Sequence, residues 1–197
     1  MEWLRIKQDF PQRTTFVVQH YVQDPALWED TGRKFHLRVF GCIVGDGKGG
    51  FTSYLFPQAF AHLSNEPFTM ALDPVTKAFP SAVNLTNVAQ NSPNSELFDG
   101  YRVVNLEEPA WREAWRKVQG VCTVVCDAAY PYIQCISSSF DFQLLGMDIL
   151  LDSEAAVHLL EINCPPCMGT QMLGDAKLCD GLHDSYLQDH RDSLASS

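Results

Sequence analysis

The sequence lacks three features, and each absence excludes a class of protein. It has no run of apolar residues near the roughly 20 that a membrane-spanning helix needs, so we expect no membrane contact. Residues 1–4 lack the basic and apolar segments that open a secretory signal peptide. Basic side chains are scarce, because 14 Lys and Arg stand against 24 Asp and Glu and the net charge is −10. A chain this acidic repels phosphate backbones, so we expect no nucleic-acid partner.

The seven cysteines also lack the pattern of a zinc site. Cys164 and Cys167 form the one Cys-x-x-Cys pair, and no second ligand pair at a similar spacing is evident. Cys122 and Cys126 are one helical turn apart. The alternatives are a zinc knuckle and buried cytosolic thiols, and the spacing favours the thiols.

What is present suffices for one hydrophobic core. The 197 residues are 46% hydrophobic and 19% charged, which is typical of a globular domain. We predict a single domain over residues 1–197, with a folded core over 14–188 and a frayed tail over 189–197.

Hydrophobic periodicity predicts strands joined by turns and then a long helix. Residues 34–44 alternate between apolar and polar, and the glycine-rich segment 45–50 predicts a turn before a returning strand over 51–56. The best helix spans 107–130, with Pro109 in its first turn and an apolar stripe at helical spacing. The other predictions are a strand over 14–21, a turn-rich linker over 24–32, loops over 64–95 and a helix over 171–187.

Residues 140–167 predict a β-hairpin. Two apolar runs flank the turn residues at 152–154, and Pro165 and Pro166 end the second strand because proline cannot continue a central strand. In a hairpin the pairing register between the two strands is fixed by the turn, and this register determines which side chains lie opposite each other.

Three polar side chains lie inside this apolar hairpin. If Asp148 lies opposite Glu161, then Gly146 lies opposite Asn163, and all four positions share one face of the sheet. Two carboxylates and one amide oxygen on one face form a hard-oxygen site suited to Mg²⁺ and phosphate. The alternative is a solvent-facing hairpin with ordinary polar residues, and the pattern alone favours neither.

Lys34, His36 and Arg38 alternate with apolar residues and therefore share one face of their strand. Three basic side chains on one face repel each other unless an anion lies between them. We predict an anion-binding face that suits ATP phosphates or the phosphate of an acyl-phosphate intermediate. The alternative is a solvated strand face.

Four ordered segments resemble the tubulin–tyrosine ligase family of ATP-grasp ligases. Residues 148–152 and 159–166 (DILLD and LLEINCPP) resemble its closing motif, an Asp strand followed by L-(L/I)-E-(V/I)-N-x-x-P. Residues 17–27, which contain VVQHY and DPAL, resemble the family segment V-I-Q-x-Y-(I/L)-x-x-P-L. Residues 34–38 (KFHLR) resemble K-F-D-(I/L)-R, and residues 84–87 (NLTN) resemble H-L-T-N.

The resemblance implies a fold and a set of site residues. The fold is α+β and ATP-grasp-like, with a mainly antiparallel sheet flanked by helices, and it corresponds to the C-terminal half of the ATP-grasp domain. The metal ligands are Asp148, Glu161 and Asn163, which would hold Mg²⁺, and the catalytic residues are Lys34 and Arg38. The expected ATP-binding residues are Lys34, Asp148, Glu161 and Asn163, together with Gln19, His20 and Tyr21 in the adenine-binding hinge, and Asn84, Thr86 and Asn87.

The chain also departs from the family pattern. His36 stands where the family usually has Asp, Pro57 and Gln58 replace the Arg and Glu of Y-R-E-G, and His62 aligns with a following Arg. Loss of an Arg removes bidentate bonds to a phosphate or substrate. In the family, a lysine and a glycine-rich loop that precede the hinge close over the phosphates, and we expect that half to be absent here.

The resemblance implies an ATP- and Mg²⁺-dependent carboxylate–amine ligase. It would add an amino acid of the tyrosine type to a protein C-terminus, through an acyl phosphate. The expected partners are tubulin or another protein C-terminal tail and a free amino acid, in the cytoplasm and at the cytoskeleton. The alternatives are a tubulin polyglutamylase or glycylase, and a degenerate, non-catalytic binding protein or fragment.

Overall fold

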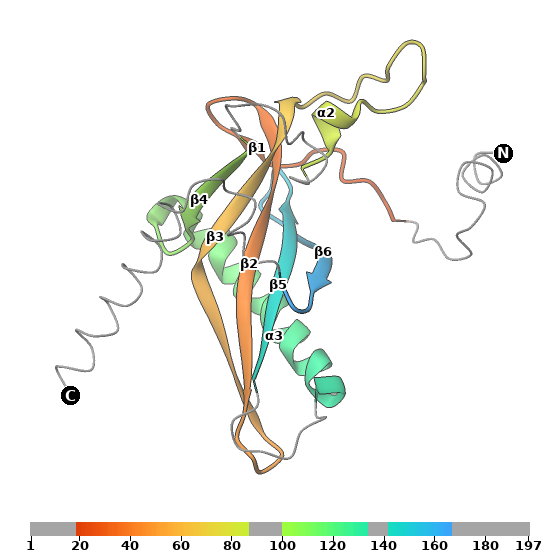
Figure 1. Cartoon of the computed structure of the whole chain (residues 1–197). Coiled ribbons are helices and arrows are strands. Elements are labelled where there is room, and N and C mark those ends of the chain that lie inside the picture. The colour runs from red at the N-terminus through yellow and green to blue at the C-terminus, as the bar shows by residue number, and fades with distance from the viewer. Residues whose placement is uncertain (1–18, 87–99, 134–141, 167–197) are drawn as a thin grey trace, which may run out of the picture.

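Six antiparallel strands form one sheet, which the computed structural model describes together with its helices over residues 19–86, 100–133 and 142–166 (Figure 1). The strand order is β4-β3-β2-β5-β6, and β1 pairs with β2 outside this path. The strands are β1 (Leu27–Trp28), β2 (Arg33–Gly45), β3 (Phe51–Pro67), β4 (Tyr101–Asn105), β5 (Phe142–Leu151) and β6 (Val157–Asn163). The helices are α2 (Ser81–Asn84), the 3-10 helix η1 (Pro109–Trp111) and α3 (Arg112–Ile133).

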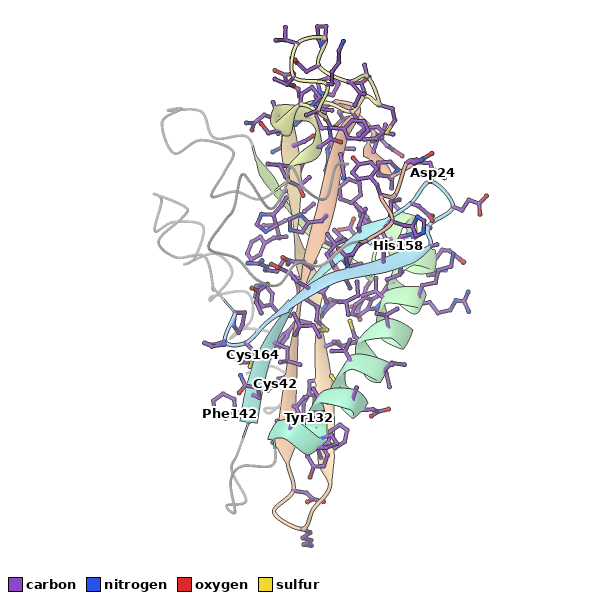
Figure 2. All side chains as sticks on the ribbon, turned by 90° about the vertical axis from the view of Figure 1, so that its right-hand side faces the viewer. Asp24, Cys42, Tyr132, Phe142, His158 and Cys164 are labelled. Atoms are coloured by element: carbon purple, nitrogen blue, oxygen red, sulfur yellow. The ribbon has the colours of Figure 1, made fainter. Side chains whose placement is uncertain are left out.

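Helix α3 covers one face of the sheet. Figure 2 shows it running along one side of the strands, with Tyr132 near one end of the helix. Its predicted apolar stripe is confirmed, because Trp115, Val118, Cys122 and Val125 are buried and Trp111 is partly buried. These side chains pack on the apolar face of β2, whose Phe35, Leu37 and Val39 belong to the same core. Burial of this apolar surface is the main stabilising contribution to the fold.

The long hairpin of β2 and β3 contains the predicted turn and two register shifts, one between Arg33 and Phe35 and one between Val39 and Gly41. At the second shift, Val39 pairs with Ala59 and Gly41 pairs with Leu55. A step of two residues along β2 therefore corresponds to a step of four along β3, so β3 contains a bulge. Pro57 lies within this bulge, where its missing N–H breaks no ladder bond. The carbonyl of Pro57 accepts a hydrogen bond of 2.8 Å from the backbone N–H of Leu106, just beyond β4.

The predicted hairpin of β5 and β6 is confirmed, and its register is the one on which the predicted metal site depends. Asp148 lies opposite Glu161, and Gly146 lies opposite Asn163. A register shift follows, because Ile149 pairs with Leu159 and leaves Leu160 as an extra residue. Without the shift, Leu159 and Glu161 would face the same side of the sheet. With it, Leu159 packs against the core while Glu161 faces the opposite side.

Several expectations are corrected by the structure. Residues 19–21 are not in a strand, although the sequence predicted one over 14–21, of which 14–18 lie outside the described residues. Strand β3 continues to Pro67, so it takes in the first residues of the predicted loop region 64–95 and extends well beyond the predicted end at residue 56. The predicted linker 24–32 contains the short strand β1. The predicted helix over 171–187 lies outside the described residues.

The described cysteines agree with the prediction of buried thiols at two positions. Cys122 and Cys126 are buried in the core, and burial raises the pKa of the Cys122 thiol to about 12. Cys42 is partly exposed and Cys164 is exposed. Within the described ranges, no three His, Cys, Asp or Glu side chains converge as a metal site. None of the helices in these ranges combines the length and hydrophobicity that crossing a bilayer requires.

Candidate functional site

A pocket of about 550 Å³ lies on the face of the sheet opposite α3. Its floor is formed by polar side chains of β2, β3 and β5, and its walls by the segment before β1, the end of α2 and strand β6. The lining residues are Gln19, His20, Tyr21, Val22, Lys34, His36, Arg38, His62, Asn84, Leu85, Thr86, Asp148, Leu150, Leu160 and Glu161. The pocket therefore brings together residues of all four motif segments.

Asp148 and Arg38 form an ion pair on the pocket floor. They are direct neighbours across β2 and β5, and the Arg38 Nε and Nη2 atoms each donate a 2.7 Å hydrogen bond to one carboxylate oxygen. Burial alone would raise the pKa of Asp148, but the hydrogen bonds from Arg38 and the charges around it lower the pKa below the usual range. The carboxylate is therefore ionised at neutral pH.

Glu161 and Asn163 lie on β6, next to Asp148. Glu161 lines the pocket with Asp148, and the Asn163 side-chain amide donates a 3.2 Å hydrogen bond to a Glu161 carboxylate oxygen. Asn163 does not itself line the pocket. The predicted metal ligands therefore occupy neighbouring positions. Their carboxylate and amide oxygens match the donors that Mg²⁺ prefers.

His36 and His62 stack on each other beside this ion pair. They are direct neighbours across β2 and β3, with ring centroids 4.8 Å apart and an angle of 5° between the ring planes. His36 Nδ1 lies 2.6 Å from the Thr86 hydroxyl oxygen, and His36 Nε2 lies 3.8 Å from an Asp148 oxygen. Among the described residues, His36 Nε2 and both His62 nitrogens are buried without a hydrogen-bond partner.

Both imidazoles are neutral. Burial lowers the pKa of His36 to about 4, against a smaller opposing effect of the Asp148 charge. Burial also lowers the pKa of His62 to about 3, and His36 and Arg38 act in the same direction. Buried polar atoms normally have partners, because leaving one unpaired costs about 1 to 3 kcal/mol. The three unpaired nitrogens are therefore suited to a ligand or to water in the pocket.

Lys34 is the second cation of the pocket. Its Nζ atom donates a 3.1 Å hydrogen bond to the Tyr21 hydroxyl and lies 4.6 Å from the centroid of the Tyr21 ring. Burial lowers the pKa of Lys34. The Tyr21 hydroxyl in turn donates to the side-chain oxygen of Asn84, and the Tyr21 ring stacks on Phe79. The side chain of Tyr21 thus contributes contacts to the pocket beyond its predicted place in the adenine-binding hinge.

The remaining predicted residues have different outcomes. Gln19 and His20 line the pocket and are exposed, and Thr86 is buried against His36. Asn87 lies outside the described residues. His62 was not among the predicted site residues, although its alignment with a family Arg was a signal for it. The extra residue Leu160 has no sequence signal, because its place depends on the bulge in β6.

The family model for the tubulin–tyrosine ligase family matches residues 2–195, which is most of the chain. The chain belongs to the tubulin–tyrosine ligase family. The predicted fold class is confirmed: the structure is α+β, with a mainly antiparallel sheet, and fits a partial ATP-grasp-like domain. The family assignment made from four short segments is thereby confirmed as well.

Relatives of this family member carry two kinds of name. The chain is 30% identical over 182 residues to the probable tubulin polyglutamylase TTLL9 of Mus musculus, covering 87% of the chain and 37% of the relative. It is 24% identical over 186 residues to the tubulin polyglutamylase ttll-4 of Caenorhabditis elegans, covering 83% and 29%. It is 23% identical over 156 residues to a probable tubulin–tyrosine ligase of Schizosaccharomyces pombe, covering 79% and 37%. The chain thus spans less than two fifths of the length of each.

Proposed function

We propose that the chain provides the metal- and anion-binding part of an ATP-dependent carboxylate–amine ligase. The observation that supports this proposal is the pocket, which joins two basic side chains of β2 to two acidic side chains of β5 and β6. A ligase of this kind must bring an anionic phosphate close to an anionic carboxylate. A pocket with both cations and metal-binding oxygens lowers the cost of that approach.

In this proposal the residues divide into two groups. Lys34 and Arg38 bind phosphate or carboxylate oxygens. Arg38 donates two hydrogen bonds from its planar guanidinium, and Lys34 contributes a compact positive charge. Asp148, Glu161 and Asn163 would hold Mg²⁺, and their hard oxygen donors fit that ion. ATP supplies the phosphoryl group that activates the carboxylate, and the ion offsets its negative charge.

The ion pair of Arg38 and Asp148 has a consequence for ligand binding. Both carboxylate oxygens of Asp148 accept hydrogen bonds from Arg38. A cation at Asp148 competes with Arg38 for these oxygens, while a phosphate oxygen competes with Asp148 for Arg38. The two ligands therefore favour each other's binding, because each releases the partner that the other needs.

The acceptor we propose is tubulin or another protein tail, in the cytoplasm and at the cytoskeleton. The names of the mouse and worm relatives favour addition of glutamate. The name of the fission-yeast relative favours the tyrosine-type addition expected from the resemblance. Incubation with tubulin, Mg·ATP and either labelled glutamate or labelled tyrosine separates these two outcomes.

The binding part of the proposal is tested by calorimetric titration of the chain with Mg·ATP. We expect heat of binding for the native chain and at least a tenfold weaker affinity for Asp148→Asn. Asp127→Asn is the matched control, because Asp127 is exposed on α3 and lies on the covered side of the sheet. Equal affinities for the two variants would contradict the placement of the metal at Asp148.

The second candidate function is a binding protein without activity. This candidate is favoured by four positions at which the chain departs from the family pattern: His36, Pro57, Gln58 and His62. An absence of heat with Mg·ATP, together with intact binding to tubulin, would support this candidate against the ligase.

A further inference from the structure

Tyr21 connects three segments around the mouth of the pocket. Its hydroxyl accepts a 3.1 Å hydrogen bond from Lys34 Nζ on β2 and donates one to the side-chain oxygen of Asn84 on α2. The side-chain amide of Asn84 then donates a 3.1 Å hydrogen bond to the Pro80 carbonyl. The Tyr21 ring stacks on Phe79 with a centroid distance of 5.5 Å and an interplanar angle of 12°.

The hydrogen bonds that link Lys34, Tyr21 and Asn84 all run in one direction. An ammonium group can only donate, so the Tyr21 hydroxyl must accept from Lys34 and has its own proton left for Asn84. With that proton, the amide oxygen of Asn84 is satisfied, and its amide nitrogen is free to donate to Pro80. Aligned hydrogen bonds of this kind polarise and strengthen one another.

Lys34 needs such a support because its environment is unusual for a lysine. The residue is only 8% exposed, and no carboxylate of the described residues forms an ion pair with it. Lysine is rarely buried unless a counter-charge lies nearby. A phenol oxygen and an aromatic face stabilise the ammonium without neutralising it. The positive charge therefore remains available to an anion that enters the pocket.

We propose that the Tyr21 side chain is a positioning residue, which holds the Lys34 ammonium in the pocket for an anionic ligand. The phenol fixes the direction of Nζ, and Asn84 and Phe79 fix the phenol. Tyr21 acts on the ligand through Lys34 rather than by direct contact. The inference rests on the proposed function only for the identity of the anion.

The arrangement of Lys34 can be tested without any ligand. Reductive methylation with formaldehyde and borohydride, followed by peptide mass spectrometry, gives the rate at which each lysine is modified. We expect Tyr21→Phe to speed methylation of Lys34 several-fold, because the ring remains but the hydrogen bond is lost. Asn84→Leu should have a similar, smaller effect, since it removes the acceptor of the Tyr21 proton.

Two internal references make the methylation result specific. Lys117 lies on α3, on the other side of the sheet, so its rate should not change. Tyr54→Phe is the matched variant, because Tyr54 is 56% exposed on β3 and does not line the pocket. An unchanged Lys34 rate in Tyr21→Phe, with the melting temperature preserved, would overturn the proposal. A general rise at Lys34 and Lys117 together would overturn it too, because it would indicate loosening of the whole fold.

A double-variant cycle tests the action through Lys34 with Mg·ATP as the probe. We expect Tyr21→Phe to weaken binding about tenfold in the native chain, and to have no effect in a Lys34→Ala background. An equal loss in both backgrounds would overturn the proposal, because Tyr21 would then contact the ligand itself. If the native chain binds no Mg·ATP, the proposed function fails, and the methylation rates alone decide the role of Tyr21.

Discussion

The two faces of β2 are both largely inaccessible to water around residues 35–39 but differ in what covers them. On one face, Leu37 and Val39 are 0% exposed beneath the apolar side chains of α3. On the other face, His36 is 6% exposed and is covered by His62, Thr86 and Asp148. The first face satisfies every group it buries, since hydrocarbon needs only close packing. The second face leaves ring nitrogens of two histidines unpaired among the described residues.

This difference separates stability from binding. Apolar burial on the α3 face stabilises the sheet whether or not a ligand is present. The polar face gains its full set of hydrogen bonds only when something enters the pocket, so it contributes less to the free protein. Substitutions on the two faces should therefore have effects of different size and sometimes of opposite sign.

The largest expected effect is on the apolar face. Leu37→Ala should lower the free energy of unfolding by about 3 to 5 kcal/mol, because it leaves a cavity beneath α3. Urea denaturation followed by circular dichroism measures the change. Leu27→Ala is the control, because Leu27 is 41% exposed and should cost far less. A loss below about 1 kcal/mol for Leu37→Ala would remove the distinction between the faces.

The next largest effect should come from breaking the ion pair on the polar face. Arg38→Met leaves the Asp148 carboxylate buried without its cation and should cost about 3 kcal/mol of unfolding free energy. The double variant Arg38→Met with Asp148→Asn should recover part of this loss in the same denaturation experiment. Arg116→Met, which removes an exposed pair with Glu113, should change stability by at most about 0.5 kcal/mol.

Acidification should have the next largest effect, because it lowers the contribution of the polar face to the free energy of unfolding. The folded pKa values of His36 and His62 are about 4 and about 3, below the ordinary 6.5 that applies to the unfolded chain. Below pH 6.5 the unfolded chain therefore binds more protons, so stability is complete above that pH and falls as the pH drops. Between pH 7.5 and 5.5 we expect a loss of about 2 to 3 kcal/mol from the two histidines.

A variant can assign this pH dependence to the pair. His62→Phe should remove roughly half of the loss between pH 7.5 and 5.5, as measured by urea denaturation at each pH. Asp148 contributes little in this window, because its pKa is lowered and it stays ionised until more acid conditions. An unchanged pH slope in His62→Phe would mean that other groups titrate in its place.

The smallest effect should have the opposite sign. His62→Phe at pH 7.5 keeps the ring that stacks on His36 but removes two buried nitrogens without partners, so stability should rise by about 1 kcal/mol. Thermal denaturation at pH 7.5 detects the change. His158→Phe is the control, because it removes a nitrogen that lies 3.0 Å from Asp152 and should lower stability slightly. A clear destabilisation by His62→Phe would identify the histidine pair as a satisfied structural element.

Much of the sheet follows from local patterns in the sequence. The turn at residues 45–50 and the stripe of α3 were predicted, because each depends on periodicity or on a short turn. The pairing of Asp148 with Glu161 was the register that the predicted metal site assumed, and the structure has it. The length of β3 was missed, because Pro57 argues against a continuing strand. The bulge that accommodates Pro57 is fixed by pairing with β2 and β4, which lie elsewhere in the chain.

The site was predictable in its charges but not in its contacts. Lys34, Arg38 and Asp148 follow from strand alternation together with the family motifs, and the structure places them in one pocket. The role of the Tyr21 side chain depends on Asn84, which is 63 positions away and which strand alternation cannot place beside it. The stacking of His36 on His62 depends on the register between β2 and β3, which the bulge at Pro57 shifts.

The extra residue Leu160 in β6 makes the length of this hairpin as important as its composition. Leu159 faces the core and Glu161 faces the pocket only because one residue between them is left out of the ladder. Substitution of Leu160 changes a pocket wall, whereas its deletion would force either Leu159 or Glu161 onto the wrong side of the sheet. Over evolutionary time, such a hairpin can drift in its side chains far more freely than it can gain or lose a codon.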